Sequence, residues 1–290
     1  MNVQNSFEAS SSGVLYVVPT PIGNLEDITY RALSVLQSVT IIAAEDTRHT
    51  KKLLNHFDIK TPLISYHEHN KKEREEALIS RLKQGETIAV VSDAGMPAIS
   101  DPGHDLVVAA IQKDLSVVVL PGANAALCAL VGSGLPASAF TFIGFLPRKT
   151  KEKVAELERL KQHTSTLIFY ESPYRVKDTL STIESVFGDR HIAIARELTK
   201  KYEQFVRGTV RELVDWMDTH PIKGECCIVV EGAHETSNDT ESMWWASYTI
   251  KAHVDHYIVD EQMSSKSAIK QAALDRNIPK RDVYQAYHID

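Results

Sequence analysis

The first half of the chain alternates short apolar runs with segments of helical spacing. The apolar runs, rich in valine, isoleucine and leucine, predict strands at residues 15–19, 40–46, 63–66, 87–93 and 116–122. Helices are predicted between them at 27–39, from Thr47 onward, at 71–85 and at 105–113. Strands that are apolar throughout and separated by helices are typical of a parallel sheet covered on both faces. We therefore predict an α/β domain over residues 14–122.

Three residues are predicted to mark helix ends. Asp27 should be the N-cap of the first helix, because a carboxylate accepts hydrogen bonds from unpaired backbone N–H groups. Gly85 and Gly188 should end the helices that they follow, since glycine tolerates the left-handed conformation common at that position.

A second α/β domain is predicted over residues 123–233, because the pattern changes after Pro136. Its strands are predicted at 140–146, 165–172, 191–197, 202–210 and 225–232, and its helices at 150–162, 174–188 and 211–217. Only residues 198–201 separate two of these strands, which is too short for a crossover helix. Those strands should be antiparallel neighbours, so the second sheet should be mixed.

The remaining segments are polar or helical. Residues 1–13 have neither a basic flank nor an apolar core, and they predict a disordered leader rather than a secretory signal. Residues 234–242 predict a polar linker, and residues 243–290 a helical tail. Ala268, Ala272, Ala273, Ile278 and Val283 have the spacing of a helix-turn-helix, although a helical cap without nucleic-acid contact would show the same pattern.

Composition narrows the class of protein. With 290 residues, 43% hydrophobic and 24% charged, the chain is an ordinary globular one with room for two domains. No apolar run approaches the ~20 residues of a membrane helix, so no membrane association is expected. Cys128, Cys226 and Cys227 lack CxxC spacing, which predicts reduced structural thiols and a cytoplasmic location. The net charge of −6 means that any nucleic acid must be bound by local basic patches.

Several common chemistries lack their motifs. The first strand ends in PTPIGNL rather than GxGxxG, and the chain has no GxxxxGK[ST]. Neither an HExxH zinc motif nor a GxSxG nucleophile elbow occurs. These absences weaken dinucleotide, nucleoside-triphosphate and hydrolase interpretations, and no metal is expected.

The candidate chemistry lies in loops that follow the strands. AVVSDAGMPAISDPGHDLV, residues 89–107, leaves a buried strand and enters a loop too long for a surface turn. Comparable loops are VPTPIGNLEDIT, AAEDTRHT, LPGANAAL, FYESPYR and ARELTK. They should gather at the carboxyl edges of the sheets and line one cleft. Its carboxylates would suit a cationic ligand, and they are Glu45, Asp46, Asp93, Asp101, Glu171 and Glu197.

These loops, in this order, resemble those of the class III S-adenosylmethionine-dependent methyltransferases, the family of the tetrapyrrole methylases. Within it, they look like the bacterial enzymes that methylate the ribose 2′-oxygen of a decoding-centre cytidine in 16S ribosomal RNA. The resemblance covers about residues 14–232. It implies two α/β domains with S-adenosylmethionine in the cleft between them, a homodimer, and 16S rRNA within the small ribosomal subunit as partner. The cofactor-binding residues it implies are Asp93, Ala94, Gly95, Ile99, Ala125, Ala126, Tyr170, Glu171, Leu198 and Gly224.

Methyl transfer to a hydroxyl group benefits from a base that accepts the proton. Asp101 is the first candidate, because its loop should reach the methyl group. Capping the next helix is its alternative role. Asp46 and Arg48, beside Glu45, form a second candidate catalytic group, with Arg48 better suited to pairing with a phosphate or carboxylate.

Two basic clusters are candidate RNA contacts. Arg148, Lys149, Lys151 and Lys153 begin a predicted helix that leaves the cleft, although glutamates among them equally fit an ordinary solvated face. The tail adds Lys266, Lys270, Lys280 and Arg281. Two other functions remain open: the same cofactor with a tetrapyrrole or protein acceptor, and a non-catalytic nucleic-acid-binding regulator.

Overall fold

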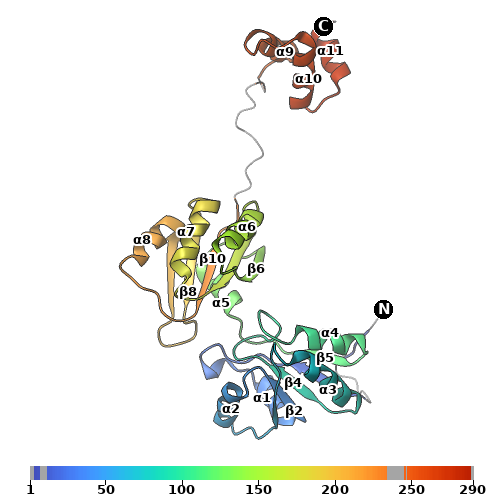
Figure 1. Ribbon diagram of the computed structural model, residues 1–290, viewed down its shortest axis with the longest axis vertical. Coiled ribbons are helices and arrows are strands. Elements are labelled where there is room, and N and C mark those ends of the chain that lie inside the picture. Colours follow the sequence, from blue (N-terminus) through green and yellow to red (C-terminus); the bar gives the residue numbers. More distant parts are fainter. Residues whose placement is uncertain (1–2, 7–11, 234–244, 246, 289–290) are drawn as a thin grey trace. The chain divides into compact units, whose positions relative to one another are not determined.

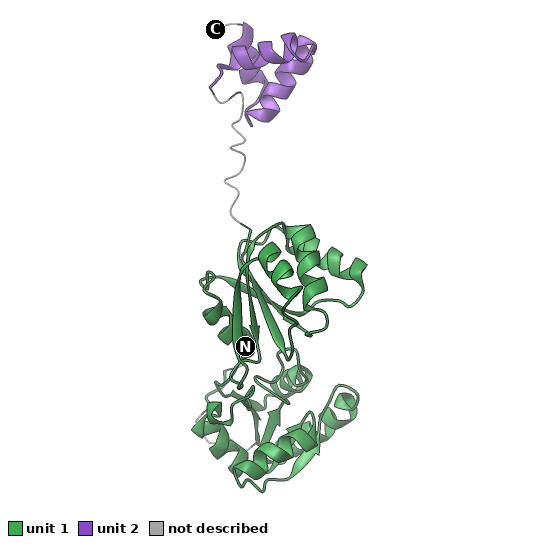
Figure 2. Cartoon of the chain, turned by 90° about the vertical axis from the view of Figure 1, so that its left-hand side faces the viewer, with its two compact units in different colours: residues 1–233 green, residues 234–290 purple. Residues whose placement is uncertain are grey.

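The chain forms two compact units, residues 1–233 and 234–290, coloured separately in Figure 2. The computed structural model describes residues 3–6, 12–233, 245 and 247–288, with the elements labelled in Figure 1. The predicted polar linker at 234–242 and most of the predicted leader lie outside the described residues. Within the leader, the Gln4 side chain pairs with the backbone of Val117, through two hydrogen bonds of 2.8 Å.

The first sheet is parallel throughout, as the apolar runs predicted, with the strand order β3-β2-β4-β1-β5. Its strands are β1 (Val14–Val17), β2 (Ile41–Ala44), β3 (Leu63–Ser65), β4 (Ile88–Val91) and β5 (Ser116–Val119). The helices are α1 (Tyr30–Ser38), α2 (Thr47–His56), α3 (Lys71–Lys83) and α4 (His104–Gln112). Buried residues of α1 and α2 pack in one core cluster, and those of α3 and α4 in another, so both faces are covered.

The second sheet is mixed, also as predicted, with the order β6-β7-β10-β8-β9. Its strands are β6 (Phe140–Phe145), β7 (Thr166–Glu171), β8 (His191–Arg196), β9 (Gln204–Thr209) and β10 (Cys226–Val230). Strands β6 and β7 are parallel, while β8 and β9 are antiparallel, which confirms the inference from their short connection. One face carries α5 (Ala125–Ser133), and the other carries α6 (Thr150–Leu160), α7 (Val176–Phe187) and α8 (Val210–Met217).

Two local predictions about these helices were wrong. Asp27 is not an N-cap, because it lies in a short 3-10 helix, η1 (Leu25–Asp27), and the Thr29 side chain caps α1 instead. Helix α5 was not predicted, because its sequence AALCALVGS is apolar on nearly every side and has no helical period. Gly188 caps α7 as expected, and Gly85 directly follows the C-cap of α3.

The second unit is a cluster of three helices in its described part: α9 (Ile250–Val259), α10 (Ser265–Asp275) and α11 (Lys280–His288). Val254, Ala268, Ile269, Ala272 and Val283 form its core, so the small and apolar spacing in the sequence is that of a packed interior. Among the described residues of the whole chain, no helix has the length and apolar character needed to cross a membrane.

Candidate functional site

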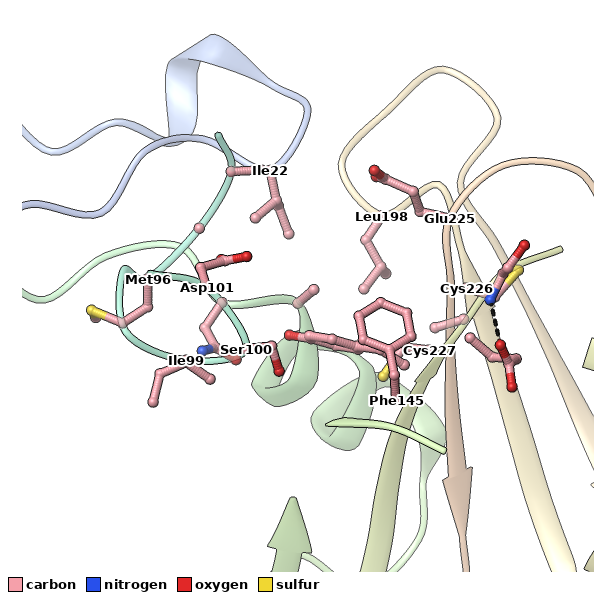
Figure 3. Close-up of a pocket in the computed structure, with 18 of the residues that line it drawn as sticks. Ile22, Met96, Ile99, Ser100, Asp101, Phe145, Leu198, Glu225, Cys226 and Cys227 are labelled. Atoms are coloured by element: carbon pink, nitrogen blue, oxygen red, sulfur yellow. Dashed lines mark hydrogen bonds between the residues drawn. The ribbon is translucent and has the colours of Figure 1, made fainter. Parts of the chain in front are cut away.

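A cavity of about 430 Å³ lies between the carboxyl edges of the two sheets of the first unit, and we call it the interdomain cavity. Figure 3 shows Ile22 and Asp101 on one side of it and Leu198 and Phe145 on the other. Its lining residues are Ile22, Ala94, Gly95, Met96, Ile99, Ser100, Asp101, Asn124, Ala125, Phe145, Tyr170, Glu171, Ser172, Pro173, Ala195, Leu198, Glu225, Cys226 and Cys227. The volume falls within the ~300–1,000 Å³ typical of small-molecule sites.

The ionisable lining of the interdomain cavity favours a cationic ligand. Asp101, Glu171 and Glu225 contribute carboxylates, and no lysine, arginine or histidine occurs among the described residues that line it. Glu171 is 2% exposed, accepts hydrogen bonds of 2.8 Å from Ser172 N and Thr179 Oγ1, and lies 3.4 Å from Arg175 Nη1. Glu225 pairs with Lys200 at 2.8 Å, so Asp101 is the lining carboxylate that has no ion pair among the described residues, and a positively charged ligand would complement it.

The loop after β4 forms the wall on the side of the first sheet. Gly95 exchanges two backbone hydrogen bonds of 3.0 Å with Thr20, which ties this loop to the one after β1. Gly95 has a φ of 77°, and the non-glycine residues Ala98 and Ser100 have φ values of 69° and 62°. Left-handed conformations at non-glycine residues cost free energy and are concentrated at functional sites. The loop is therefore held in a strained shape around the cavity.

Asp101 is a carboxylic acid whose pKa this environment perturbs strongly. Burial, together with the nearby carboxylates of Glu45 and Asp93, raises its pKa to about 6. A hydrogen bond with Ser92 acts in the opposite direction. Its alternative role as a helix cap is not found, because the N-cap of α4 is Gly103 and no side chain of the described residues caps that helix.

The wall on the side of the second sheet is aromatic and sulfur-rich. The Tyr170 ring contacts Phe142 and Phe145 edge to face, with centroid distances of 4.9 and 5.7 Å. Burial raises the pKa of the Tyr170 hydroxyl to about 12, and it raises those of the Cys226 and Cys227 thiols to about 12 as well. These groups therefore stay neutral. All three cysteines are free, and Cys226 and Cys227 are buried, in agreement with the prediction of structural thiols.

The structure brings most of the predicted cofactor residues to the interdomain cavity. Those that line it are Ala94, Gly95, Ile99, Ala125, Tyr170, Glu171 and Leu198. Asp93 instead lines a neighbouring cavity, and Ala126 is buried within α5. Gly224 is not at the cavity either: a Cβ atom there would lie 2.3 Å from Glu197 Cδ, so close packing explains the glycine.

Asp46 and Arg48, the second candidate catalytic group, lie outside the lining of the interdomain cavity. Asp46 caps α2 by accepting a 2.8 Å hydrogen bond from Arg48 N, and its other oxygen pairs with Arg48 Nη2 at 2.7 Å. These bonds hold the pKa of Asp46 far below its usual range. Neither residue lines the interdomain cavity, and the Arg48 side chain is 88% exposed. Glu45 lies closer to the site, with a pKa raised by burial and by Asp93.

One predicted RNA contact is wrong. The Lys153 side chain is 0% exposed, and its Nζ lies 2.5 Å from Asp178 Oδ2 and 3.2 Å from Thr179 Oγ1. It is a buried partner of α7 and cannot reach a nucleic acid. The other predicted RNA contacts are exposed: Arg148, Lys149 and Lys151 in the first unit, and Lys266, Lys270, Lys280 and Arg281 in the second. Lys149 pairs with Glu152 at 3.0 Å, as the alternative of a solvated face implied.

Several lining residues were missed by sequence reasoning. Asn124 accepts a hydrogen bond from Leu127 N and caps α5, a role that asparagine before an apolar run signals. Phe145 is 59% exposed at the carboxyl end of β6, and an aromatic residue at that position was a usable signal. Ala195 and the two cysteines lie inside strands, where nothing in the sequence separates a cavity wall from a core.

Comparison with known proteins identifies the family. Residues 14–214 match the model of the tetrapyrrole (corrin/porphyrin) methylases. The chain is 55% identical over 292 aligned residues to a Bacillus subtilis protein named ribosomal RNA small subunit methyltransferase I, and the alignment covers 99% of this chain and 98% of that one.

Two solved structures share the fold at low sequence identity. Diphthine synthase is similar with a TM-score of 0.60 and 13% identity, covering 76% of this chain and 90% of that one. A uroporphyrin-III C-methyltransferase from Thermus thermophilus, complexed with S-adenosyl homocysteine, is similar with a TM-score of 0.53 and 17% identity, covering 75% and 97%. At this identity the likeness concerns the fold alone.

Proposed function

Because the chain belongs to the tetrapyrrole (corrin/porphyrin) methylase family, we propose that it transfers the methyl group of S-adenosylmethionine to ribosomal RNA of the small subunit. The main support for ribosomal RNA as the methyl acceptor is the 55% identity to a small-subunit rRNA methyltransferase. The alignment covers 99% of this chain and includes the helical second unit. The structural neighbours named for diphthine and uroporphyrin are at most 20% identical, so they do not favour those acceptors.

The interdomain cavity fits this methyl donor. S-adenosylmethionine carries its reactive methyl group on a positively charged sulfur, and its remaining surface combines apolar and hydrogen-bonding groups. The carboxylate of Asp101 complements such a charge, while Ile22, Ile99 and Leu198 provide apolar contact. We propose that Ala94, Gly95, Ala125 and Tyr170 complete the donor site, with the loop after β4 as its wall on the side of the first sheet.

The acceptor atom that we propose is the ribose 2′-oxygen of a cytidine in 16S rRNA. A 2′-hydroxyl is a weak acid, and a positioned base accelerates its attack by about 10²–10⁴-fold. Asp101 is suited to this step, because a pKa of about 6 leaves it ionised at neutral pH yet basic enough to accept a proton. The fixed walls of the cavity orient the reacting atoms, which is the largest contribution a protein makes to an in-line displacement.

Small ribosomal subunits from a bacterial strain that lacks this protein provide the test. They are incubated with the protein and methyl-labelled S-adenosylmethionine, and the RNA is then hydrolysed with alkali. Alkali cleaves RNA through a free 2′-hydroxyl, so ribose methylation leaves the label in an alkali-resistant dinucleotide. Label in mononucleotides would contradict the ribose assignment, and label only in a uroporphyrin-type tetrapyrrole supplied in parallel would contradict an RNA acceptor.

We further propose that the protein acts as a cytoplasmic homodimer without a metal. Light scattering of the purified protein measures its mass against the 32.3 kDa of one chain. Turnover that persists after treatment with a chelator would support a metal-free reaction, and its loss would contradict it.

A further inference from the structure

A second cavity, of about 380 Å³, adjoins the interdomain cavity on the side of α2, and we call it the α2 cavity. Its walls come from α2, from the loop after β1 and from the residues that follow β4. Ile22, Ala94 and Glu225 line both cavities, so the two are separated only by these shared residues.

The α2 cavity differs from the interdomain cavity because its unpaired charged side chains are basic. His49, Lys52 and His56 occupy positions i, i+3 and i+7 of α2, which places them on one face of the helix, and all three are exposed. No ion pair or hydrogen bond of these three side chains occurs within the described part of the chain. Thr50 lies on the same wall, and its buried hydroxyl has no hydrogen-bond partner among the described residues.

The remaining charged groups that line the α2 cavity are already bonded. Asp93 accepts a 3.1 Å hydrogen bond from Asp46 N. Lys200 pairs with Glu225 at 2.8 Å and with Glu197 at 3.1 Å. The α2-cavity side chains that have no ion pair or hydrogen bond among the described residues are therefore basic or hydroxylic, whereas the interdomain cavity has the carboxylate of Asp101 without an ion pair.

We propose that the α2 cavity binds a phosphodiester group of the acceptor RNA next to the methylated ribose, with Lys52, His49 and His56 as its ligands. This inference rests on the proposed function. A nucleic acid that presents a ribose to the interdomain cavity must place its adjoining phosphates nearby, and the α2 cavity adjoins that site across the wall of Ile22 and Ala94. Lysine and histidine are common phosphate partners, and they suit a site that must release its RNA after each turnover.

The matched pair of variants for the test is Lys52→Ala and Lys51→Ala. Both lysines are exposed on α2 and both substitutions remove one positive charge, but only Lys52 lines the α2 cavity. For each variant, kcat and KM for unmethylated small subunits are measured between about 50 and 200 mM salt, a range over which phosphate contacts weaken strongly. The dissociation constant of S-adenosylhomocysteine is measured by calorimetry.

We expect Lys52→Ala to raise KM for the subunit by about tenfold at low salt and to lower the salt slope of kcat/KM by about one. Lys51→Ala should leave both quantities close to wild type, and both variants should keep the wild-type affinity for S-adenosylhomocysteine. Equal effects of the two variants would show general attraction by α2 and overturn the inference. A weaker affinity of Lys52→Ala for S-adenosylhomocysteine would assign the cavity to the donor and would also overturn it. An absence of wild-type turnover would refute the proposed function itself, whereas wild-type turnover with an unaffected Lys52→Ala variant would refute only this inference.

Discussion

Replacing Asp101 with asparagine separates its chemical role from any structural one. The amide has nearly the same shape as the carboxylate but cannot accept a proton from the attacking hydroxyl. We expect Asp101→Asn to lower kcat by about 10²–10⁴-fold, the usual contribution of a positioned base. Donor affinity should change little, because the apolar and backbone groups of the interdomain cavity remain.

The same substitution should raise the stability of the protein, and the sign follows from the pKa. The pKa of Asp101 is raised from 3.8 to about 6, chiefly by burial, so the folded protein holds this proton more tightly than the unfolded chain. Stability contributed by the group is therefore present below pH 3.8 and is lost as the pH rises through about 6. A shift of this size corresponds to at most about 3 kcal/mol at neutral pH, and partial exposure of Asp101 reduces it to about 1–2 kcal/mol.

Denaturant unfolding and turnover, measured on the same preparations, test this reasoning. Above about pH 7, Asp101→Asn should unfold at a higher denaturant concentration than the wild type, and the difference should shrink toward about pH 4. Calorimetry with S-adenosylhomocysteine reports donor affinity. A variant that is less stable than the wild type at neutral pH and retains near-normal turnover would refute the assignment, because Asp101 would then be a structural residue.

Three further outcomes follow from the site and its supports. In the wild type, kcat/KM should fall by about tenfold per pH unit below about pH 6, as Asp101 becomes protonated; a profile that stays flat to pH 5 would exclude it as the base. Lys153→Ala should lower the free energy of unfolding by about 2–4 kcal/mol, because it leaves a buried void. Lys153→Met should change it by less than about 1.5 kcal/mol, because methionine has a similar volume. Equal losses of the two variants in urea unfolding would show that the charge of Lys153, rather than its volume, stabilises the protein. Gly95→Ala should weaken S-adenosylhomocysteine binding and cost about 1–2 kcal/mol of stability, because φ is 77° and the new Cβ would lie 3.2 Å from Ile22 Cγ2; unchanged calorimetry and melting would contradict this.

Predictions from the sequence succeeded where local chemistry decides structure. The runs rich in valine, isoleucine and leucine predicted every strand of the first sheet, because helices cover both faces of that sheet. The short connection of residues 198–201 predicted antiparallel pairing of β8 with β9, because chain length alone excludes a crossover. The loop after β4 was recognised from glycine and proline, which fix the backbone approach that Gly95 makes to Thr20.

Predictions failed where a distant segment decides the environment. Lys153 lies among charged residues at the start of a helix and has the pattern of a surface lysine, yet Asp178 and Thr179 of α7 enclose it. Gly224 matched a cofactor position, but its lack of a side chain makes room for Glu197. Asp46 and Arg48 looked catalytic because both are charged near a strand end, and the structure pairs them with each other. The contacts of Lys153 and Gly224 join segments that are distant in the sequence, whereas Asp46 and Arg48 lie two residues apart and pair locally at the start of α2.

The wall of Ile22, Ala94 and Glu225, common to both cavities, limits how this protein can diverge. A bulkier residue at one of these positions would reduce the volume of the cavity that it faces. A smaller residue would join the interdomain cavity to the α2 cavity. Changes in acceptor preference during evolution are therefore expected on the face of α2 that carries His49, Lys52 and His56, because substitutions there leave the interdomain cavity intact.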